Sequence, residues 1–160
     1  MHHLPDLGPR GEGWVLVQGI LFVLIAAAGT LPPAWDGPAR AASVVLGVIL
    51  VGCGGVLALL GSRDLNVGGS FTAVPRPRAT GSLVETGVYA RVRHPIYGGI
   101  VLAAVGWGLA CASPVSLLLA AVLLGFFFLK SAREEIWLAE RFPDYPAYRA
   151  RTRRFIPFVA

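Results

Sequence analysis

Four long apolar runs without a charged residue dominate this chain of 160 residues. A helix crosses the hydrocarbon core of a membrane, which is about 30 Å thick, with about 20 residues. The run at 41–61 meets that length by itself, and the other three runs meet it together with their flanking residues. The pattern predicts an all-α fold, a polytopic membrane protein with four transmembrane helices, at about 14–31, 41–61, 96–112 and 114–130.

The composition excludes several other classes of protein. Charged residues make up 14% of the chain, against about 25% in a typical globular protein. Too little polar surface therefore remains for a soluble particle, and a disordered or collagen-like chain is excluded as well. Cys53 and Cys111 stand in apolar stretches with no further Cys or His at ligand spacing. We predict neither a disulfide scaffold nor a metal site.

The positive charges indicate how the chain is oriented. Of the 14 Lys and Arg residues, Arg40 lies in the first connection and the other 13 lie in the N-terminal segment, the second connection or the tail. With four spans, these three segments share one side of the membrane, and positive residues favour the cytoplasm. We expect an integral protein of the cytoplasmic membrane with both termini cytoplasmic. Topology also explains the net charge of +5 without a nucleic-acid partner.

The first apolar run has an alternative interpretation as a signal peptide. Its small residues at 26–28 resemble a cleavage site, but the segment before it carries Arg10 as its only Lys or Arg. A signal peptide begins with a more positive region. We therefore predict a retained helix.

The third and fourth helices are predicted to form a tight antiparallel hairpin. Only Ser113 and Pro114 separate the two apolar runs. Since Ser can cap a helix and Pro can stand in its first turn, the fourth helix can begin directly after the third one ends. The helical pattern then continues to Pro143, and Asp144 can cap a short helix through about Thr152. The stretch at 62–79 is rich in Gly, Pro and Arg, which predicts a loop.

The hairpin brings two polar segments to the same height. Arg91, Arg93, His94 and Tyr97 begin the third helix, and Lys130, Arg133, Glu134 and Glu135 follow the fourth apolar run. One pocket can therefore contain a His, several cations and two carboxylates. Such a pocket suits a zwitterion, whose ammonium needs a carboxylate and whose carboxylate needs cations or helix N–H groups.

Three segments, in this order, resemble motifs of the isoprenylcysteine carboxyl methyltransferase and phospholipid N-methyltransferase group. Residues 93–99 match its R-H-P-x-Y-x-G segment, residues 134–138 match E-E-x-x-L, and the stretches at 142–148 and 154–157 resemble its closing aromatic and R-x-I-P elements. The similarity covers 82–158, about half of the chain. This sequence departs from the pattern at Val88, which replaces Pro, and at 143–144, which replace Gly and Glu.

The resemblance implies a single integral-membrane methyltransferase domain, 1–160, that uses S-adenosylmethionine. The resemblance does not name the acceptor, but a site at the foot of membrane helices favours a lipophilic or small amphipathic acceptor that enters from the membrane lipids at the cytoplasmic face. Arg93 and Arg133 are the implied catalytic candidates, with Lys130 as the alternative to Arg133. The implied cofactor-binding residues are His94, Tyr97, Gly98, Gly99, Glu134 and Glu135.

Two other functions stay open at the level of the sequence. A sterol-type reductase resembles this group in its C-terminal region but uses NADPH, and four spans leave little room for a sterol and a dinucleotide. A small non-enzymatic membrane accessory protein is the other alternative. The chain carries no G-x-G-x-x-G motif after a strand, so a soluble Rossmann-type cofactor site is not expected.

Overall fold

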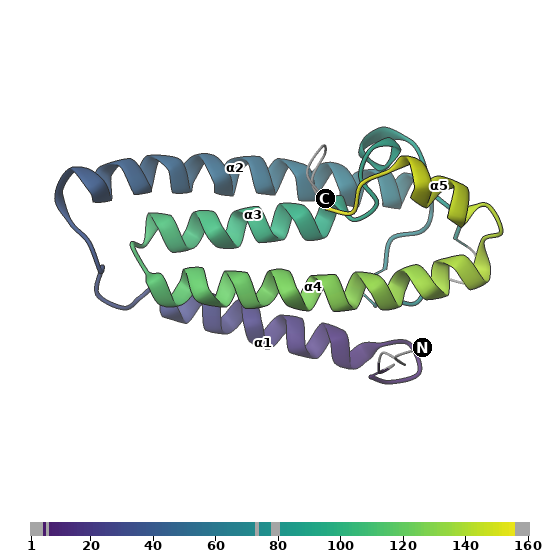
Figure 1. Ribbon diagram of the computed structural model, residues 1–160, viewed down its shortest axis with the longest axis horizontal. Coiled ribbons are helices and arrows are strands. Elements are labelled where there is room, and N and C mark those ends of the chain that lie inside the picture. The colour runs from purple at the N-terminus through teal and green to yellow at the C-terminus, as the bar shows by residue number, and fades with distance from the viewer. Residues whose placement is uncertain (1–4, 6, 73, 78–80, 156–160) are drawn as a thin grey trace.

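The structure, a computed structural model, describes residues 5, 7–72, 74–77 and 81–155. Within these residues the fold is all-helical, as predicted, and four long helices run side by side along one axis in the order α2, α3, α4, α1 (Figure 1). Each connection turns the chain back, so neighbours in the sequence are antiparallel. The elements are α1 (Glu12–Ala28), α2 (Gly37–Val67), the 3-10 helix η1 (Gly87–Ala90), α3 (Pro95–Ala110), α4 (Pro114–Arg141) and α5 (Tyr145–Arg151).

Two of these helices, α2 and α4, are long and apolar enough to cross a membrane. The helices α1 and α3 are apolar but contain 17 and 16 residues, fewer than the roughly 20 that an upright span uses. The start of α3 is fixed by Pro95, because the residues before it pair with the tail instead of continuing the helix. The four-span arrangement therefore stays a prediction.

The outer faces of the bundle are apolar. Side chains such as Val23 on α1, Leu59 on α2 and Leu118 on α4 are 67% to 71% exposed. An apolar surface that extends over several helices is unusual for a soluble monomer and indicates contact with a membrane or a partner. The core lies between α1, α3 and α4, and includes Ile25 and Leu123.

Glycines bring α2 and α3 into backbone contact. Gly47 and Gly54 of α2 face Gly106 and Gly99 of α3, seven residues apart on each helix. A Cβ atom at Gly47 would lie 2.5 Å from the carbonyl oxygen of Gly106, and one at Gly54 would meet that of Gly99. The close approach of two helices through small residues is typical of membrane proteins.

The facing glycines predict a difference between two neighbouring positions of α2. Gly54→Ala should lower the free energy of unfolding by about 1 to 3 kcal/mol, because the added methyl group overlaps a backbone that cannot move alone. Gly52→Ala is the matched control, since a Cβ at Gly52 meets nothing within 4 Å and gains helix propensity. Thermal unfolding in a neutral detergent measures both variants, and equal stabilities would contradict the packing.

The hairpin of α3 and α4 is confirmed. The Ser113 hydroxyl accepts a hydrogen bond from the Ser116 N–H at 3.2 Å and donates one to the Ala28 carbonyl at 2.8 Å. The cap therefore also joins the hairpin to the end of α1. Ala112 makes the turn in the left-handed region, at φ 51°.

Several local predictions need correction. Helix α2 continues to Val67, so residues 62–67 are helical and the loop begins at Gly68. The carboxylate of Asp64 near that end accepts a hydrogen bond from the Val88 N–H, 3.0 Å away, which ties the last turn of α2 to η1. Asp144 precedes α5 as predicted, but its side chain makes no capping hydrogen bond. The motif positions 156 and 157 lie outside the described residues.

Candidate functional site

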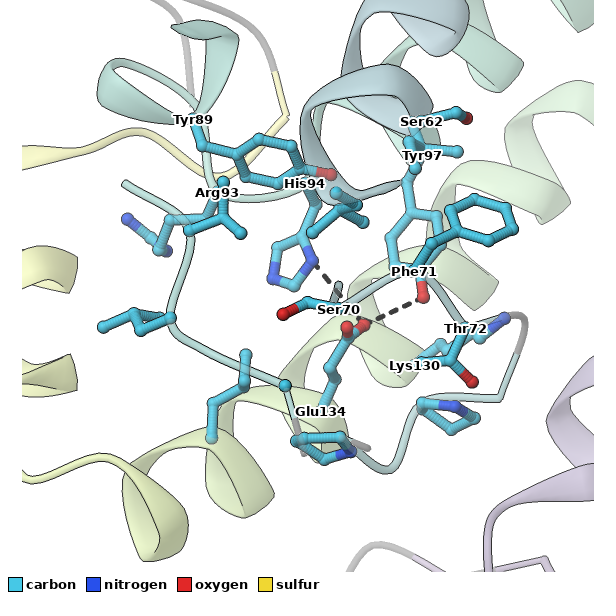
Figure 2. Close-up of a pocket in the computed structure, with 18 of the residues that line it drawn as sticks. Ser62, Ser70, Phe71, Thr72, Tyr89, Arg93, His94, Tyr97, Lys130 and Glu134 are labelled. Atoms are coloured by element: carbon cyan, nitrogen blue, oxygen red, sulfur yellow. Dashed lines mark hydrogen bonds and ion pairs between the residues drawn. The ribbon is translucent and has the colours of Figure 1, made fainter. Parts of the chain in front are cut away.

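A cavity of about 260 Å³ lies where α2 ends and α3 begins, beside the second half of α4. Its polar lining includes Tyr89, Arg93, His94, Lys130 and Glu134. The carboxylate of Glu134 lies between His94 and Tyr97, with Arg93 and Lys130 toward opposite sides of the cavity (Figure 2). The hairpin has thus brought the two polar segments together, as the sequence predicted.

Glu134 is the carboxylate that lines the cavity. It accepts a hydrogen bond from the Tyr97 hydroxyl at 2.8 Å, and the Nδ1 atom of His94 lies 3.6 Å from the same oxygen. Neither contact is with a guanidinium, and 22% of the side chain is exposed. This carboxylate is therefore able to accept further hydrogen bonds from a cation in the cavity.

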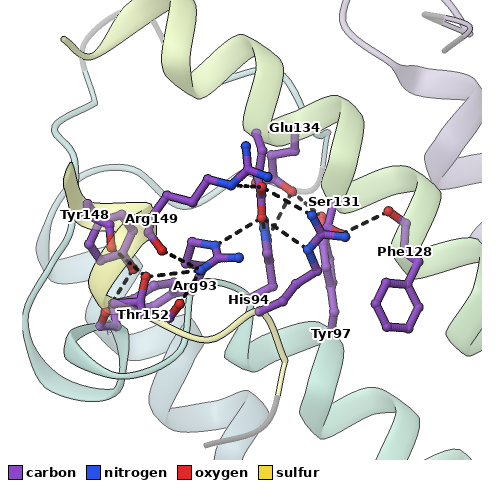
Figure 3. Close-up of polar contacts among 12 residues, drawn as sticks. Arg93, His94, Tyr97, Phe128, Ser131, Glu134, Tyr148, Arg149 and Thr152 are labelled. Atoms are coloured by element: carbon purple, nitrogen blue, oxygen red, sulfur yellow. Dashed lines mark hydrogen bonds and ion pairs between the residues drawn. The ribbon is translucent and has the colours of Figure 1, made fainter. Parts of the chain in front are cut away.

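Glu135, the next residue of α4, has a different environment. Its side chain is 3% exposed and is surrounded by the Nε atoms of Arg93, Arg149 and Arg154, at 3.1 Å, 3.4 Å and 3.4 Å, and by His94 Nε2 at 3.3 Å. Figure 3 shows how Arg93, His94 and Arg149 gather at this point. Burial alone would raise its pKa, but the hydrogen bond from His94 and the charges of the surrounding groups lower the pKa to about 2. Glu135 is thus an ionised anchor for the cations around it.

Arg93 connects the start of α3 to the tail. Besides Glu135, its guanidinium donates to the carbonyl oxygens of Arg149, at 3.1 Å, and of Thr152. The backbone nearby is paired as well, because the Arg93 N–H donates to the Arg153 carbonyl at 2.8 Å and the His94 N–H to the Arg154 carbonyl at 2.9 Å. The tail is therefore held across the beginning of α3, beside the cavity.

An aromatic stack supports the polar groups. The ring of Tyr97 lies parallel to that of Phe127, with centroids 4.5 Å apart, and parallel to the imidazole of His94 at 5.4 Å. Phe127 is fully buried in the core. The stack fixes the ring of Tyr97, so that its hydroxyl points at Glu134.

Four of the predicted site residues do not line the cavity. Gly98 packs against the backbone of Phe155 and Gly99 against that of Gly54, so both serve as close contacts between backbones. Glu135 is enclosed by its cations. The Arg133 guanidinium lies 4.4 Å from the ring centroid of Trp137, whereas Lys130 lines the cavity.

Other residues of the cavity were not predicted from the sequence. Ser70, Phe71 and Thr72 of the loop after α2 line one wall (Figure 2). Tyr145 of α5 is 1% exposed, and its hydroxyl has no hydrogen-bond partner among the described residues. Burial raises the pKa of this hydroxyl, which keeps it protonated and able to donate. The available signal in the sequence was the place of Tyr145 in the closing aromatic element at 142–148.

Comparison with known proteins gives one family and several curated relatives. A family described as phospholipid methyltransferase matches residues 42–145. The protein-S-isoprenylcysteine O-methyltransferase of Saccharomyces cerevisiae is 34% identical over 119 residues, which cover 69% of this chain and 49% of that protein. The Schizosaccharomyces pombe protein of the same name is 39% identical over 79 residues, or 48% of this chain and 34% of that protein.

A plant protein shows a similar relationship. The probable protein-S-isoprenylcysteine O-methyltransferase of Oryza sativa subsp. indica is 31% identical over 118 residues, which cover 71% of this chain and 61% of that protein. The chain thus spans between 34% and 61% of the length of these relatives. The matched region begins within α2, so α1 lies outside it.

Proposed function

Because the chain belongs to the phospholipid methyltransferase family, we propose that it transfers a methyl group from S-adenosylmethionine to a lipophilic or small amphipathic acceptor. The single domain spans 1–160, and the reaction takes place at the membrane face where the cavity lies. The observation that carries the proposal is the accessible carboxylate of Glu134 in a cavity that also contains His94 and Tyr97.

The cavity fits the amino-acid end of S-adenosylmethionine. The carboxylate of Glu134 suits an ammonium group, and the unpaired hydroxyl of Tyr145 needs an acceptor that the described residues do not supply. A buried polar group without a partner costs about 1 to 3 kcal/mol. A polar ligand in the cavity would recover this free energy. His94 and Tyr97 are retained as cofactor-binding residues, and Glu134 is selected over Glu135.

When bound, the cofactor would supply a methyl group on a positively charged sulfur, and the acceptor would bond to the methyl carbon as the carbon–sulfur bond on the opposite side breaks. The residues of this chain need to align the two molecules and exclude water. Arg93 and Glu135 hold the tail against α3, and Phe71 of the loop after α2 lines another part of the cavity wall. We assign to Arg93 the role of positioning the tail. A catalytic role for Arg133 stays a prediction.

A lipophilic acceptor agrees with the surroundings of the cavity. The apolar helices suit a membrane, and the named relatives act on isoprenylcysteine. An amphipathic molecule would keep its apolar chain in the bilayer and present its polar end at the interface.

A methyl-transfer screen tests the proposed function. Purified protein in lipid nanodiscs is incubated with methyl-labelled S-adenosylmethionine and one acceptor at a time, from phospholipids, prenyl-cysteines, fatty acids, thiols and small amines. We expect label to enter at least one lipophilic or amphipathic acceptor, and at limiting S-adenosylmethionine at least about tenfold less label with a Glu134→Gln variant that retains its fold. Transfer only to highly polar molecules that do not enter membranes would contradict the proposed acceptor class.

The orientation of the chain gives a separate prediction. With both termini cytoplasmic, Ala34 and Thr86 lie on opposite sides of the membrane, because α2 separates them. Single cysteines at these positions, in a background with Cys53 and Cys111 replaced by Ala, are labelled with an impermeant maleimide in intact cells. We expect labelling at 34 and protection at 86. Equal labelling at both positions would exclude this topology.

A further inference from the structure

Helix α1 contributes a polar residue to the cavity. Gln18 and Val15 line it, although α1 lies outside the region that matches the family. After Glu12, Gln18 is the only residue of α1 with an amide or charged side chain. It lies six residues from the helix start, about 9 Å along the axis at 1.5 Å per residue. A polar side chain at this depth in a membrane helix is costly without a partner and marks a functional position.

The partner of Gln18 is Lys130 of α4. The Lys130 ammonium donates to Gln18 Oε1 at 2.7 Å and lies 5.1 Å from the centroid of the Tyr97 ring. Lys130 is 1% exposed. Its direct partners among the described residues are the Gln18 amide oxygen and the face of the Tyr97 ring. The carboxylate of Glu134, one turn further along α4, is the nearby negative charge that favours the ammonium form, but it makes no ion pair with Lys130 within 4.0 Å.

The pair offers hydrogen-bond donors to the cavity. An ammonium has three N–H groups and accepts nothing, so Gln18 must turn its oxygen toward Lys130 and its NH₂ group remains available. Lys130 uses one of its three donors in this contact. The unused donors of both side chains, next to a buried positive charge, suit a group with several acceptor oxygens and a negative charge.

A largely apolar groove along α1 meets the cavity at Val15. It has a volume of about 650 Å³, and its lining includes Leu16, Ile20 and Val23, with Glu12 at the start of α1 as its charged residue. Val15 lines both this groove and the cavity. A molecule with a hydrocarbon chain along α1 can therefore place its polar end beside Gln18 and Lys130. Glu134, one turn further along α4, would hold the ammonium of a bound cofactor.

We propose that Gln18 and Lys130 form a recognition site for a carboxylate or phosphate group on the methyl acceptor. That the bound molecule is the methyl acceptor rests on the proposed function. The preference of the pair for an anion is independent of that function. Because α1 lies outside the family match, Gln18 adapts the common cofactor site to the acceptor of this protein. The resulting substrate class is an anionic amphiphile.

Binding of three probes of equal chain length tests the site. Octanoate, octyl phosphate and octanol are titrated into the protein in a neutral detergent, with and without S-adenosylhomocysteine. We expect the wild type to bind the two anions about ten to a hundred times more tightly than octanol, as for a charge-assisted contact in a buried site. Lys130→Met and Gln18→Leu should reduce this preference to less than threefold, and Lys130→Arg should retain it.

The result for the cofactor separates the possible failures. We expect S-adenosylhomocysteine affinity to change less than threefold in Lys130→Met. A tenfold loss of that affinity with an unchanged anion preference would overturn the assignment, because the pair would then hold the carboxylate of the cofactor. Equal binding of all three probes by the wild type would overturn it as well. If the wild type prefers the anions but binds no S-adenosylhomocysteine, the anion site stands and the proposed function fails.

Discussion

Replacing Glu134 by Gln should weaken binding of S-adenosylmethionine by roughly ten to more than a hundredfold, because the change removes a charge-assisted hydrogen bond worth about 1.5 to 3 kcal/mol. The fold should survive, since the carboxylate contacts Tyr97 and His94 but no cation of the Arg cluster, and a Gln oxygen can still accept from Tyr97. Calorimetry in a neutral detergent measures the affinity, and thermal unfolding measures the stability.

Two variants on the same helix control this result. Glu140 is exposed and does not line the cavity, and Glu140→Gln should change the affinity by less than about threefold, as for an exposed charge worth under 1 kcal/mol. Glu135→Gln should mainly lower the unfolding temperature, since Glu135 is the shared ion-pair partner of three Arg side chains. If the Glu134→Gln protein binds S-adenosylmethionine like the wild type, Glu134 does not bind the cofactor.

Replacing Arg93 by Met should lower the free energy of unfolding by about 3 to 5 kcal/mol, the usual cost of removing one partner of a buried ion pair. The side chain of Arg93 is 9% exposed and ends in contacts to Glu135, Arg149 and Thr152. Its loss leaves the tail held by backbone pairing and by the weaker contacts of Arg149 and Arg154. Chemical or thermal unfolding in detergent measures the change.

The matched control for Arg93 is Arg91, two residues earlier. Arg91 is exposed, and Arg91→Met should change the free energy of unfolding by less than about 0.5 kcal/mol. The two variants lose the same charge and gain the same side chain. Equal stabilities would show that the guanidinium of Arg93 does not hold the tail.

The hairpin and its two polar segments could be predicted from the sequence, because each depends on local signals. Ser113 and Pro114 mark a turn that leaves no room for another path. Once the turn is short, the polar ends of α3 and α4 must meet. The same reasoning correctly extended the fourth helix to the residues before Pro143.

The different roles of Glu134, which lines the cavity, and Glu135, which pairs with the Arg side chains, could not be predicted in this way. Adjacent residues on a helix point about 100° apart, and the side that becomes the cavity depends on where the tail lies. That path is fixed by backbone pairing of Val92 with Arg153, a contact between distant residues that no local pattern reveals. Similarly, Gly98 and Gly99 were predicted to contact the cofactor, but their close neighbours are the backbones of Phe155 and Gly54.

The contributions of α1 and of the loop after α2 were also missed. Gln18 is one polar residue in an apolar run. Its contact with Lys130, which follows more than 100 residues later in the chain, depends on how α1 and α4 pack together. The loop residues Ser70 and Phe71 follow no periodic pattern. Their place in the cavity wall depends on a hydrogen bond from the Ser70 hydroxyl to the Ser82 carbonyl, at 2.7 Å.

Titration of the purified wild-type chain with S-adenosylhomocysteine and with NADPH tests the proposed cofactor site most directly. The cavity with Glu134, His94 and Tyr97 predicts that one S-adenosylhomocysteine binds per chain, that Glu134→Gln weakens this binding at least tenfold, and that NADPH does not compete. Binding of NADPH without binding of S-adenosylhomocysteine would contradict the methyltransferase assignment.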